Sequence, residues 1–332
     1  MPEPADAGLP LRRGSRGEAV GDVQRRLGAL GHDLADDPAG DFDSATEAAV
    51  AAFQAQRGLP RDGIVGPVTW AALVESGWRL GDRFLYHRTP MQRGDDVAEL
   101  QSSLGALGFD AGRVDGICGP DTARALEEFQ RNSGLTADGI CGPDSVSALR
   151  RLAGRRAGPT SVAQAREAHA LRDAPRHLGD RRIVIGDPGT LDALADRVCR
   201  LLTDAGAVVT VLHAVDGSTQ AREANDLAAE LYVGLRLVAE PSCHLSFYAT
   251  EGFESVGGRR LAELGAQELG TVLDIGPSVQ GMRLPVLRET KMPAVLCELG
   301  PVDEVVVHSA DLAAALTRGI ATWVEHRLDG TL

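Results

Sequence analysis

The chain has 332 residues, a formal net charge of -13 and a sequence pI near 5.1. Hydrophobic residues make up 43% and charged residues 24%, a composition typical of a globular protein of two or three domains. The acidic balance argues against proteins that follow nucleic-acid phosphates or bind membranes through basic patches, so we expect no nucleic-acid partner. No apolar run is long enough to cross a bilayer, and we expect no membrane span.

The amino terminus reads MPEPADAGLPLRRG, without a basic stretch followed by an apolar core. This pattern predicts no secretory signal, and we expect a cytoplasmic protein. The chain has five cysteines and no CxxC pair, which favours reduced, packed thiols. A disulfide between Cys118 and Cys141, which lie in similar Gly/Pro corners, is the alternative.

One module occurs twice after a flexible segment over residues 1–10: first over residues 11–78, then over 79–153 together with a connector. Hydrophobic residues with the three- or four-residue spacing of an amphipathic helix recur between the copies: Val20, Val23, Leu27 and Leu30, then Val97, Leu100, Leu104 and Leu107. Phe53-Gln54 and Phe129-Gln130 recur further along each copy. Each copy therefore predicts three helices joined by turns.

Asp/Gly turns precede the second and third helices of each copy. Gly tolerates positive φ, Asp bonds the local backbone, and Pro suits a first helical turn. The second helix of the first copy follows Gly40-Asp41-Phe42-Asp43. The turn residues singled out by this pattern are Asp62, Gly63, Gly66, Asp115, Gly116, Gly119, Asp138, Gly139 and Gly142.

The two copies resemble the peptidoglycan-binding module of cell-wall hydrolases. Its signature joins a Gly-Asp-x-Val-x-x-Leu-Gln-x-x-Leu helix to Asp-Gly-x-x-Gly-x-x-Thr and Phe-Gln. Residues 17–27 read Gly-Glu-Ala-Val-Gly-Asp-Val-Gln-Arg-Arg-Leu, and residues 94–104 read Gly-Asp-Asp-Val-Ala-Glu-Leu-Gln-Ser-Ser-Leu. The resemblance implies two small three-helix modules. These residues are mostly scaffold, and binding of a sugar-peptide ligand stays open.

Residues 154–180 are basic and flanked by Gly and Pro, and a solvated linker is predicted there. A short helix from Ser161 to Arg172 is the alternative. From residue 181 to 328 strands and helices alternate, and residues 329–332 form a tail. The alternation predicts an α/β domain with a mainly parallel sheet covered by helices, and a site at the carboxyl ends of the strands. Strands are expected over 183–185, 207–212, 231–237, 244–248, 284–287 and 294–298, and helices over 191–205, 219–230, 256–269 and 309–327.

Three segments of this domain resemble the zinc-dependent N-acetylmuramoyl-L-alanine amidases. Where the family has Asp-Pro-Gly-His-Gly-Gly, this chain has Asp187-Pro188-Gly189-Thr190. Where the family has Ala-Asn-x-x-x-Ala-Asp-Leu-Phe-Val-Ser-Ile-His-Ala-Asn, residues 224–238 read Ala-Asn-Asp-Leu-Ala-Ala-Glu-Leu-Tyr-Val-Gly-Leu-Arg-Leu-Val. The family's Leu-Arg-x-Thr-x-x-Pro-Ala-Val-Leu-x-Glu-Leu-Gly matches residues 287–300 almost throughout.

That family holds zinc with two His and one Glu, and a second Glu moves protons. The resemblance places the two His at Thr190 and Arg236, the zinc-binding Glu in a loop that this chain lacks, and the proton-moving Glu at Glu298. We therefore expect no metal cofactor and an idle Glu298. Because arginine stays protonated, we expect Arg236 to pair with Glu298 or Asp187 in place of the metal. The expected site, without catalytic activity, comprises Asp187, Thr190, Arg236 and Glu298.

Zinc held by other ligands is the alternative. The remaining candidate ligands lack the spacing of known zinc motifs: His213, His244, Cys243, Glu298, His308 and Asp187. Cys297 is predicted to be a core thiol, because strand alternation points it away from Glu298.

Over nearly its whole length the chain resembles the CwlM-type proteins of actinobacteria, regarded as cytoplasmic regulators under Ser/Thr kinase control. The resemblance implies a non-catalytic regulator or scaffold of peptidoglycan synthesis, with a precursor-pathway enzyme such as the enolpyruvyl transferase as partner. Thr331 in the tail is the candidate phosphorylation site. Two alternatives stay open: a zinc amidase that cleaves between the muramic acid lactyl group and L-alanine, and a sensor that binds muropeptide precursors.

Overall fold

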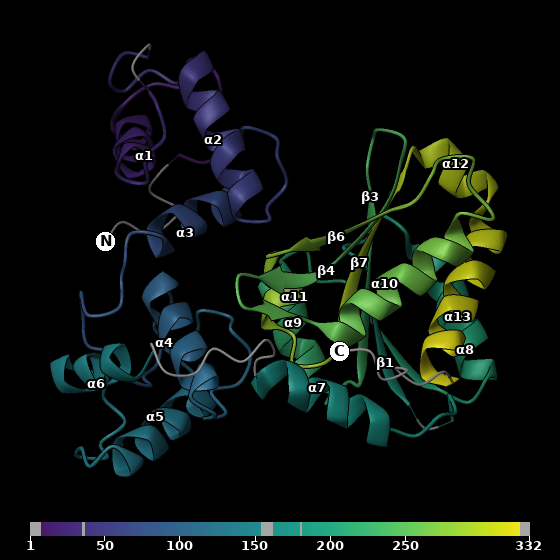
Figure 1. The fold of residues 1–332 in the computed structure, drawn as a ribbon. Helices are drawn as coiled ribbons and strands as arrows, with labels where there is room; N and C mark the ends of the chain where they lie inside the picture. The colour runs from purple at the N-terminus through teal and green to yellow at the C-terminus, as the bar shows by residue number, and fades with distance from the viewer. Residues whose placement is uncertain (1–7, 35–36, 154–161, 180, 326–332) are drawn as a thin grey trace. The chain divides into compact units, whose positions relative to one another are not determined.

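A computed structural model describes residues 8–34, 37–153, 162–179 and 181–325. Thr331, residues 154–161 of the basic linker and residue 180 lie outside these residues. The chain divides into two compact units, residues 1–163 and 164–332, and Figure 1 shows the elements of each. Within the described ranges, none of the helices has the length and apolar character needed to cross a membrane.

The first unit contains the two predicted three-helix modules. Module 1 consists of α1, α2 and α3, and module 2 of α4, α5 and α6 (Figure 1). Each helix begins directly after a turn, and α3, α5 and α6 begin with a proline, as the turn chemistry predicts. The bounds are Glu18–Ala29, Ser44–Gln56, Pro67–Glu75, Asp95–Ala106, Pro120–Asn132 and Pro143–Ala153.

Each module has its own hydrophobic core, formed by the positions that recur in the sequence. Val20 and Val23 pack with Phe53 and Trp70 in module 1. Their counterparts Val97, Leu100 and Leu104 pack with Phe129 and Leu149 in module 2. The repeated spacing therefore marks the buried stripe of each first helix, the usual source of helix stability in a small domain.

The second unit is an α/β domain. Its helices are α7 (Val162–Asp173), α8 (Asp192–Asp204), α9 (Gly217–Asp226), α10 (Val256–Leu269), α11 (Pro285–Glu289), α12 (Val302–Val307) and α13 (Ser309–Glu325). Its strands are β1 (Arg182–Gly186), β2 (Val208–Leu212), β3 (Leu231–Leu237), β4 (Ser242–Thr250), β5 (Phe253–Glu254), β6 (Ser278–Met282) and β7 (Ala294–Gly300).

The strand order is β2-β1-β3-β7-β4-β5, and β6 also pairs with β4. Strands β2, β1, β3 and β7 run parallel to one another, whereas β4 is antiparallel to β7. The sheet is therefore mostly parallel, as predicted, and it is mixed because β4 runs antiparallel to β7.

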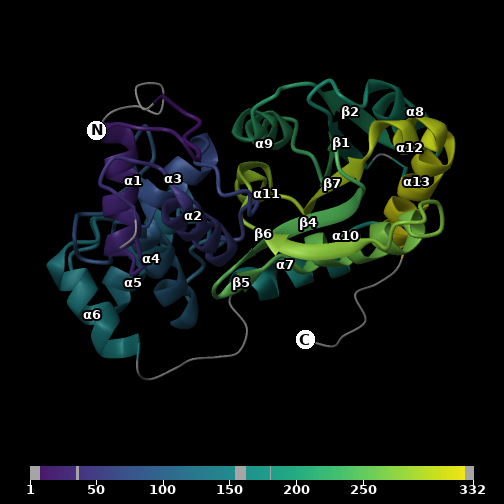
Figure 2. The ribbon, with the colours of Figure 1, turned by 90° about the horizontal axis from the view of Figure 1, so that it is seen from above.

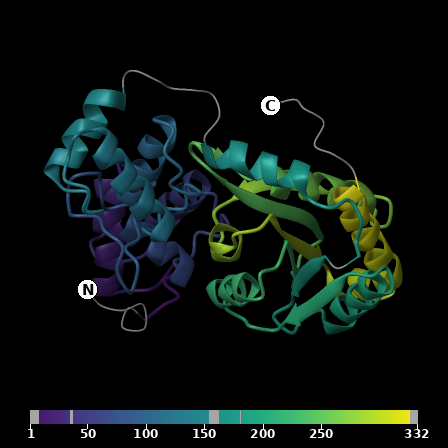
Figure 3. The same cartoon turned by 90° about the horizontal axis from the view of Figure 1, so that it is seen from below.

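Helices cover both faces of the sheet. Side chains of α8, α10 and α13 pack with alternate strand residues in the main core, and we call this the core face. Figure 2 shows α9 on the opposite side of the sheet from α10, and Figure 3 shows α7 on the opposite side from α9. We call the side that carries α9 and α11 the α9 face. Cys297 is 1% exposed within the main core, which confirms its prediction as a core thiol.

Two predictions made from local patterns need correction. Residues 284–287 were expected to form a strand, but α11 begins at Pro285, whose fixed φ suits a first helical turn. A short apolar run does not distinguish a strand from a buried helical turn. The segment preferred as linker contains α7, where Glu167 accepts a hydrogen bond from the Ser255 hydroxyl at 2.6 Å. Strands β5 and β6 were missed.

Candidate functional site

A buried glutamine organises each Asp/Gly turn of the modules. Gln54 in α2 donates to the Asp62 carboxylate at 2.7 Å and to the Thr69 hydroxyl at 3.1 Å, and its own oxygen accepts from the Gly63 amide at 2.9 Å. Gln130 makes the same three contacts with Asp138, Ser145 and Gly139. Gln101 makes them with Asp115, Thr122 and Gly116.

The fourth turn, between α1 and α2, departs from this pattern. Gln24 donates to the carbonyl oxygen of Asp41 and to the Thr46 hydroxyl, while Gly40 donates to the Gln24 oxygen. The carboxylate that organises the backbone here is Asp37, which accepts from the amides of Asp43 and Thr46 at 3.1 and 2.6 Å. In the other three turns the glutamine amide donates to the carboxylate of the turn Asp. In this turn, where Gly precedes Asp, it donates to the Asp41 backbone carbonyl instead.

The singled-out turn residues are therefore structural, although not all for the same reason. Gly63, Gly116 and Gly139 have φ near +70°, where side chains with a Cβ are strained. Gly66 and Gly119 have ordinary negative φ at the starts of α3 and α5. A Cβ at Gly142 would lie 2.9 Å from the Phe84 ring, so this glycine leaves space for that ring.

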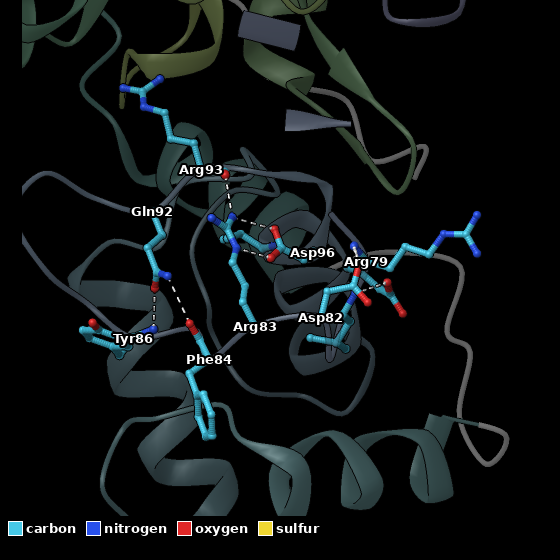
Figure 4. A network of polar contacts seen from close by, with 11 residues as sticks. Arg79, Asp82, Arg83, Phe84, Tyr86, Gln92, Arg93 and Asp96 are labelled. Carbon is cyan, nitrogen blue, oxygen red and sulfur yellow. Dashed lines mark hydrogen bonds and ion pairs between the residues drawn. The ribbon is translucent and has the colours of Figure 1, made fainter. Parts of the chain in front are cut away.

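Module 2 carries a strap over residues 79–93 that is held by a polar network (Figure 4). The Arg83 guanidinium contacts the buried Asp96 carboxylate at 2.7 Å. The Gln92 side chain donates a hydrogen bond to the Phe84 carbonyl and accepts one from the Tyr86 amide. Figure 4 shows the Phe84 ring pointing away from this network. The Phe84 and Tyr86 side chains are 58% and 39% exposed.

The site expected at the carboxyl ends of the strands is built around an ion pair. Arg236 on β3 and Glu298 on β7 are register partners in adjacent parallel strands. The Arg236 Nη1 lies 3.2 Å from the Glu298 Oε1, with side chains 42% and 18% exposed. This confirms the expected pairing of Arg236 with one of the two candidate carboxylates.

The pair belongs to a row of polar residues on the α9 face. His244 on β4 is the register partner of Glu298, and Ser278 on β6 is the partner of His244. The His244 Nδ1 lies 2.6 Å from the Ser278 hydroxyl oxygen. Four neighbouring strands thus each supply one polar residue. His244 was predicted as a candidate metal ligand, whereas Ser278 was not singled out because β6 was not predicted.

Asp187 and Thr190 serve the turn between β1 and α8. Asp187 is fully buried, and its carboxylate accepts from the amides of Thr190 and Leu191 at 3.0 Å. Thr190 is exposed. Because α8 begins at Asp192, this turn leaves no length for an inserted ligand loop.

Asp187 also lies beside two groups on the α8 side. The ligand atoms of Asp187, Asp192 and His213 all lie within 4.8 Å of one another, a grouping that could hold a metal ion. A hydrogen bond with Asp187 raises the pKa of the Asp192 carboxyl above its usual range. Asp187 and His213 were predicted as candidate ligands, whereas Asp192 was not, because an Asp at a helix start is common without a metal.

Zinc does not fit the two positions that the resemblance to the amidases predicts for its histidine ligands. Those positions hold the Thr190 hydroxyl and the Arg236 guanidinium, and an arginine cannot offer a lone pair to a metal. Two further candidate ligands are otherwise engaged: His308 lies 3.5 Å from Glu304 on α12, and Cys243 is packed in the main core. Burial raises the pKa of the Cys243 thiol to about 11.

The amidase-like segments that this chain retains have structural roles. Asn225 at the end of α9 donates to the Glu289 carbonyl at 2.9 Å and accepts from the Lys291 amide at 2.8 Å. The Thr290 hydroxyl, 1% exposed, donates to the Leu287 carbonyl. These contacts hold α11 against α9, so the segment has a structural role that does not depend on a metal.

The fold and the site define a class of protein in which two peptidoglycan-binding modules precede an N-acetylmuramoyl-L-alanine amidase-like domain. Residues 16–73 and 93–149 match the peptidoglycan binding domain family PG_binding_1. The chain is 35% identical to the N-acetylmuramoyl-L-alanine amidase CwlM of Mycobacterium tuberculosis, over 98% of this chain and 91% of that protein. It belongs to the CwlM family.

Two further similar proteins each match less than half of this chain. The N-acetylmuramoyl-L-alanine amidase CwlL of Bacillus licheniformis is 36% identical over 151 residues, which is 39% of this chain and 42% of that protein. The crystal structure of the N-acetylmuramyl-L-alanine amidase Ami1 from Mycobacterium smegmatis aligns with a TM-score of 0.39 and 17% identity, over 45% of this chain and 98% of that one.

Proposed function

We propose that the chain is a non-catalytic regulator or scaffold of peptidoglycan synthesis, in which an amidase domain has been retained as a binding platform. The observation that carries this proposal is the Arg236–Glu298 ion pair at 3.2 Å. Arg236 stands at a family ligand position, and Glu298 at the position of the proton-moving carboxylate.

The pair opposes amidase chemistry in two ways. The guanidinium keeps its positive charge at any physiological pH, so it takes a place where the family needs a neutral imidazole bound to a cation. Glu298 would have to exchange protons with a zinc-bound water, yet its carboxylate is held by a cation from the neighbouring strand. Thr190 offers only a hydroxyl at the other ligand position.

The direct test is digestion of purified muropeptides, with release of stem peptides followed by mass spectrometry. The full chain, supplied with zinc, is expected to release none, while a zinc amidase of the parent family serves as the positive control. Release of stem peptide that EDTA abolishes would overturn the proposal and support the zinc amidase alternative.

As a regulator, the chain is proposed to act in the cytoplasm on a precursor-pathway enzyme such as the enolpyruvyl transferase. Calorimetry with the purified transferase measures this directly, and a second titration uses the transferase already bound to its nucleotide-sugar substrate. Calorimetry is expected to show binding, and an assay of the transferase is expected to show a changed rate when the chain is added. If neither the unmodified nor the kinase-treated chain binds the transferase or changes its rate, this partner is contradicted.

A second candidate function is a sensor of muropeptide precursors. It is favoured by the exposed Phe84 and Tyr86 rings on module 2, since aromatic faces suit contact with sugar rings and apolar peptide groups. Calorimetry with a nucleotide-linked muramyl pentapeptide should then give heat that Phe84→Ala reduces. The matched control is Leu201→Ala, an exposed apolar residue of the other unit. Equal heat for the unchanged chain and for both variants would show that the exposed strap residue Phe84 does not contribute to precursor binding.

A further inference from the structure

Three side chains from separate segments meet at one edge of the α/β domain. Asp187 directly follows β1, His213 directly follows β2, and Asp192 is the first residue of α8. The last register pair of β1 and β2 joins Gly186 to Leu212, and the Asp187 amide donates to the Leu212 carbonyl at 2.8 Å. Asp187 and His213 are therefore neighbours at the carboxyl ends of adjacent parallel strands.

Strand alternation points both side chains toward α8. Ile183 and Ile185 of β1 belong to the main core, and Val209 and Val211 of β2 pack against it. Residues two further along, Asp187 and His213, continue the same side of their strands. The cluster thus lies on the core side of the sheet edge, whereas Arg236 and Glu298 lie on the α9 face.

The donor atoms are close enough to share one ion. All three ligand atoms lie within 4.8 Å of one another, and the His213 Nδ1 is 3.6 Å from the Asp192 Oδ1. Side-chain rotation can shorten these separations, because Asp192 and His213 are 66% and 57% exposed. Asp187, by contrast, is fully buried and fixed by backbone amides, so it forms the rigid part of the site.

We propose that Asp187, Asp192 and His213 form a binding site for a divalent transition-metal ion such as Mn²⁺ or Zn²⁺. Two carboxylate oxygens and one imidazole nitrogen suit these ions better than Ca²⁺, which prefers oxygen ligands alone. Water completes the coordination, since three protein ligands leave positions open. This site shares no residue with the Arg236–Glu298 pair and does not rest on the proposed function.

Charges on both sides of the cluster affect how it would hold a cation. The buried Asp187 carboxylate and the Asp192 carboxylate lie within 4.8 Å of each other, and a cation between them would offset the repulsion of two negative charges. The amino end of α8 disfavours a cation, but its amides at Thr190 and Leu191 already donate to Asp187. The ion would fasten the ends of β1 and β2 to the first turn of α8.

Calorimetry of the tag-free, EDTA-stripped full chain with MnCl₂ and with ZnCl₂ tests the proposal. One equivalent should bind, and Asp192→Asn and His213→Gln should each weaken binding by at least about tenfold, since even outer-shell substitutions cost about 10–100-fold. The matched control is the exposed pair of His169 and Asp173, 3.4 Å apart on α7. His169→Gln and Asp173→Asn should leave binding unchanged.

A second measurement locates the ion without relying on affinity. Mn²⁺ should broaden the NMR signals of the His213 ring at substoichiometric amounts and leave those of His169 sharp. Absence of heat with both metals up to millimolar concentration overturns the proposal. Binding that survives both cluster substitutions, or that falls equally with the control substitutions, overturns it as well. Circular dichroism of each exposed-residue variant shows that its fold is intact.

Discussion

The glutamine-centred turns of the modules and the polar row of the α/β domain both consist of polar side chains, but they differ in how far those side chains are buried. In the turns, polar groups are buried and satisfy one another, as Gln54 does with Asp62 and Thr69. In the row, Arg236 and His244 remain partly open to solvent. Buried polar groups whose hydrogen bonds are all formed within the protein stabilise one fold. Partly exposed charged groups can still form hydrogen bonds or ion pairs with a ligand.

The largest expected effect is the loss of one turn glutamine. Gln54→Ala removes hydrogen bonds to a carboxylate, a carbonyl and a hydroxyl and leaves the Gly63 amide unpaired, which should cost about 3 kcal/mol of unfolding free energy. Urea unfolding followed by circular dichroism measures it. Gln56→Ala, two residues along the same helix and exposed, is the matched control and should be near neutral. Equal losses of unfolding free energy in the two variants would show that the buried turn glutamine is no more important to stability than an exposed one.

A glycine pair in module 1 tests whether the turn requires its backbone conformation. Gly63 has φ of +70°, and an added Cβ would lie 3.0 Å from the Glu47 Cγ, so Gly63→Ala should cost about 1–2 kcal/mol. Gly66 has φ of -85° and open space around its Cβ position, so Gly66→Ala should change stability by less than about 0.5 kcal/mol. Thermal unfolding of the two variants compares them directly, and similar melting temperatures would contradict this account.

Acid should weaken module 2 through Asp138. Hydrogen bonds from the Ile140 amide and the Gln130 side chain lower the pKa of Asp138 in the folded protein. Its stabilising contribution is therefore full above the unfolded pKa of about 3.9 and is lost as pH falls through the folded pKa. Asp138→Asn should flatten the pH dependence of the urea midpoint over that range. Asp144→Asn, at an exposed position in α6, should not.

The smallest expected effect comes from the ion pair itself. Because the Arg236 side chain is 42% exposed, its coupling to Glu298 should contribute only about 0.5 kcal/mol to stability. A double-mutant cycle with Arg236→Gln and Glu298→Gln measures that coupling. A coupling above about 2 kcal/mol would show that the pair supports the fold much as the buried turns do, and would remove the contrast between the two regions.

Much of the domain structure could be read from local sequence. The tandem repeat, the hydrophobic spacing of α1 and α4 and the alternation of strands with helices predicted both modules and a mainly parallel sheet. The pairing of Arg236 with a carboxylate also followed, because a charge at a partly buried strand end requires a partner. The errors fell on short segments, such as α11 and β6, where a few apolar residues suit several structures.

By itself, the sequence determined which segments form helices, turns and parallel strands, since those depend on spacing, glycine and proline within a few residues. It also predicted, through the resemblance to the amidases, that Arg236 stands where that family has a zinc-binding histidine. Only the tertiary structure decided that Glu298 rather than Asp187 is the partner, that Ser278 joins His244, and that Asp192 meets Asp187 and His213. Those meetings depend on strand register and on where a helix begins relative to a distant strand, and no local pattern encodes such long-range geometry.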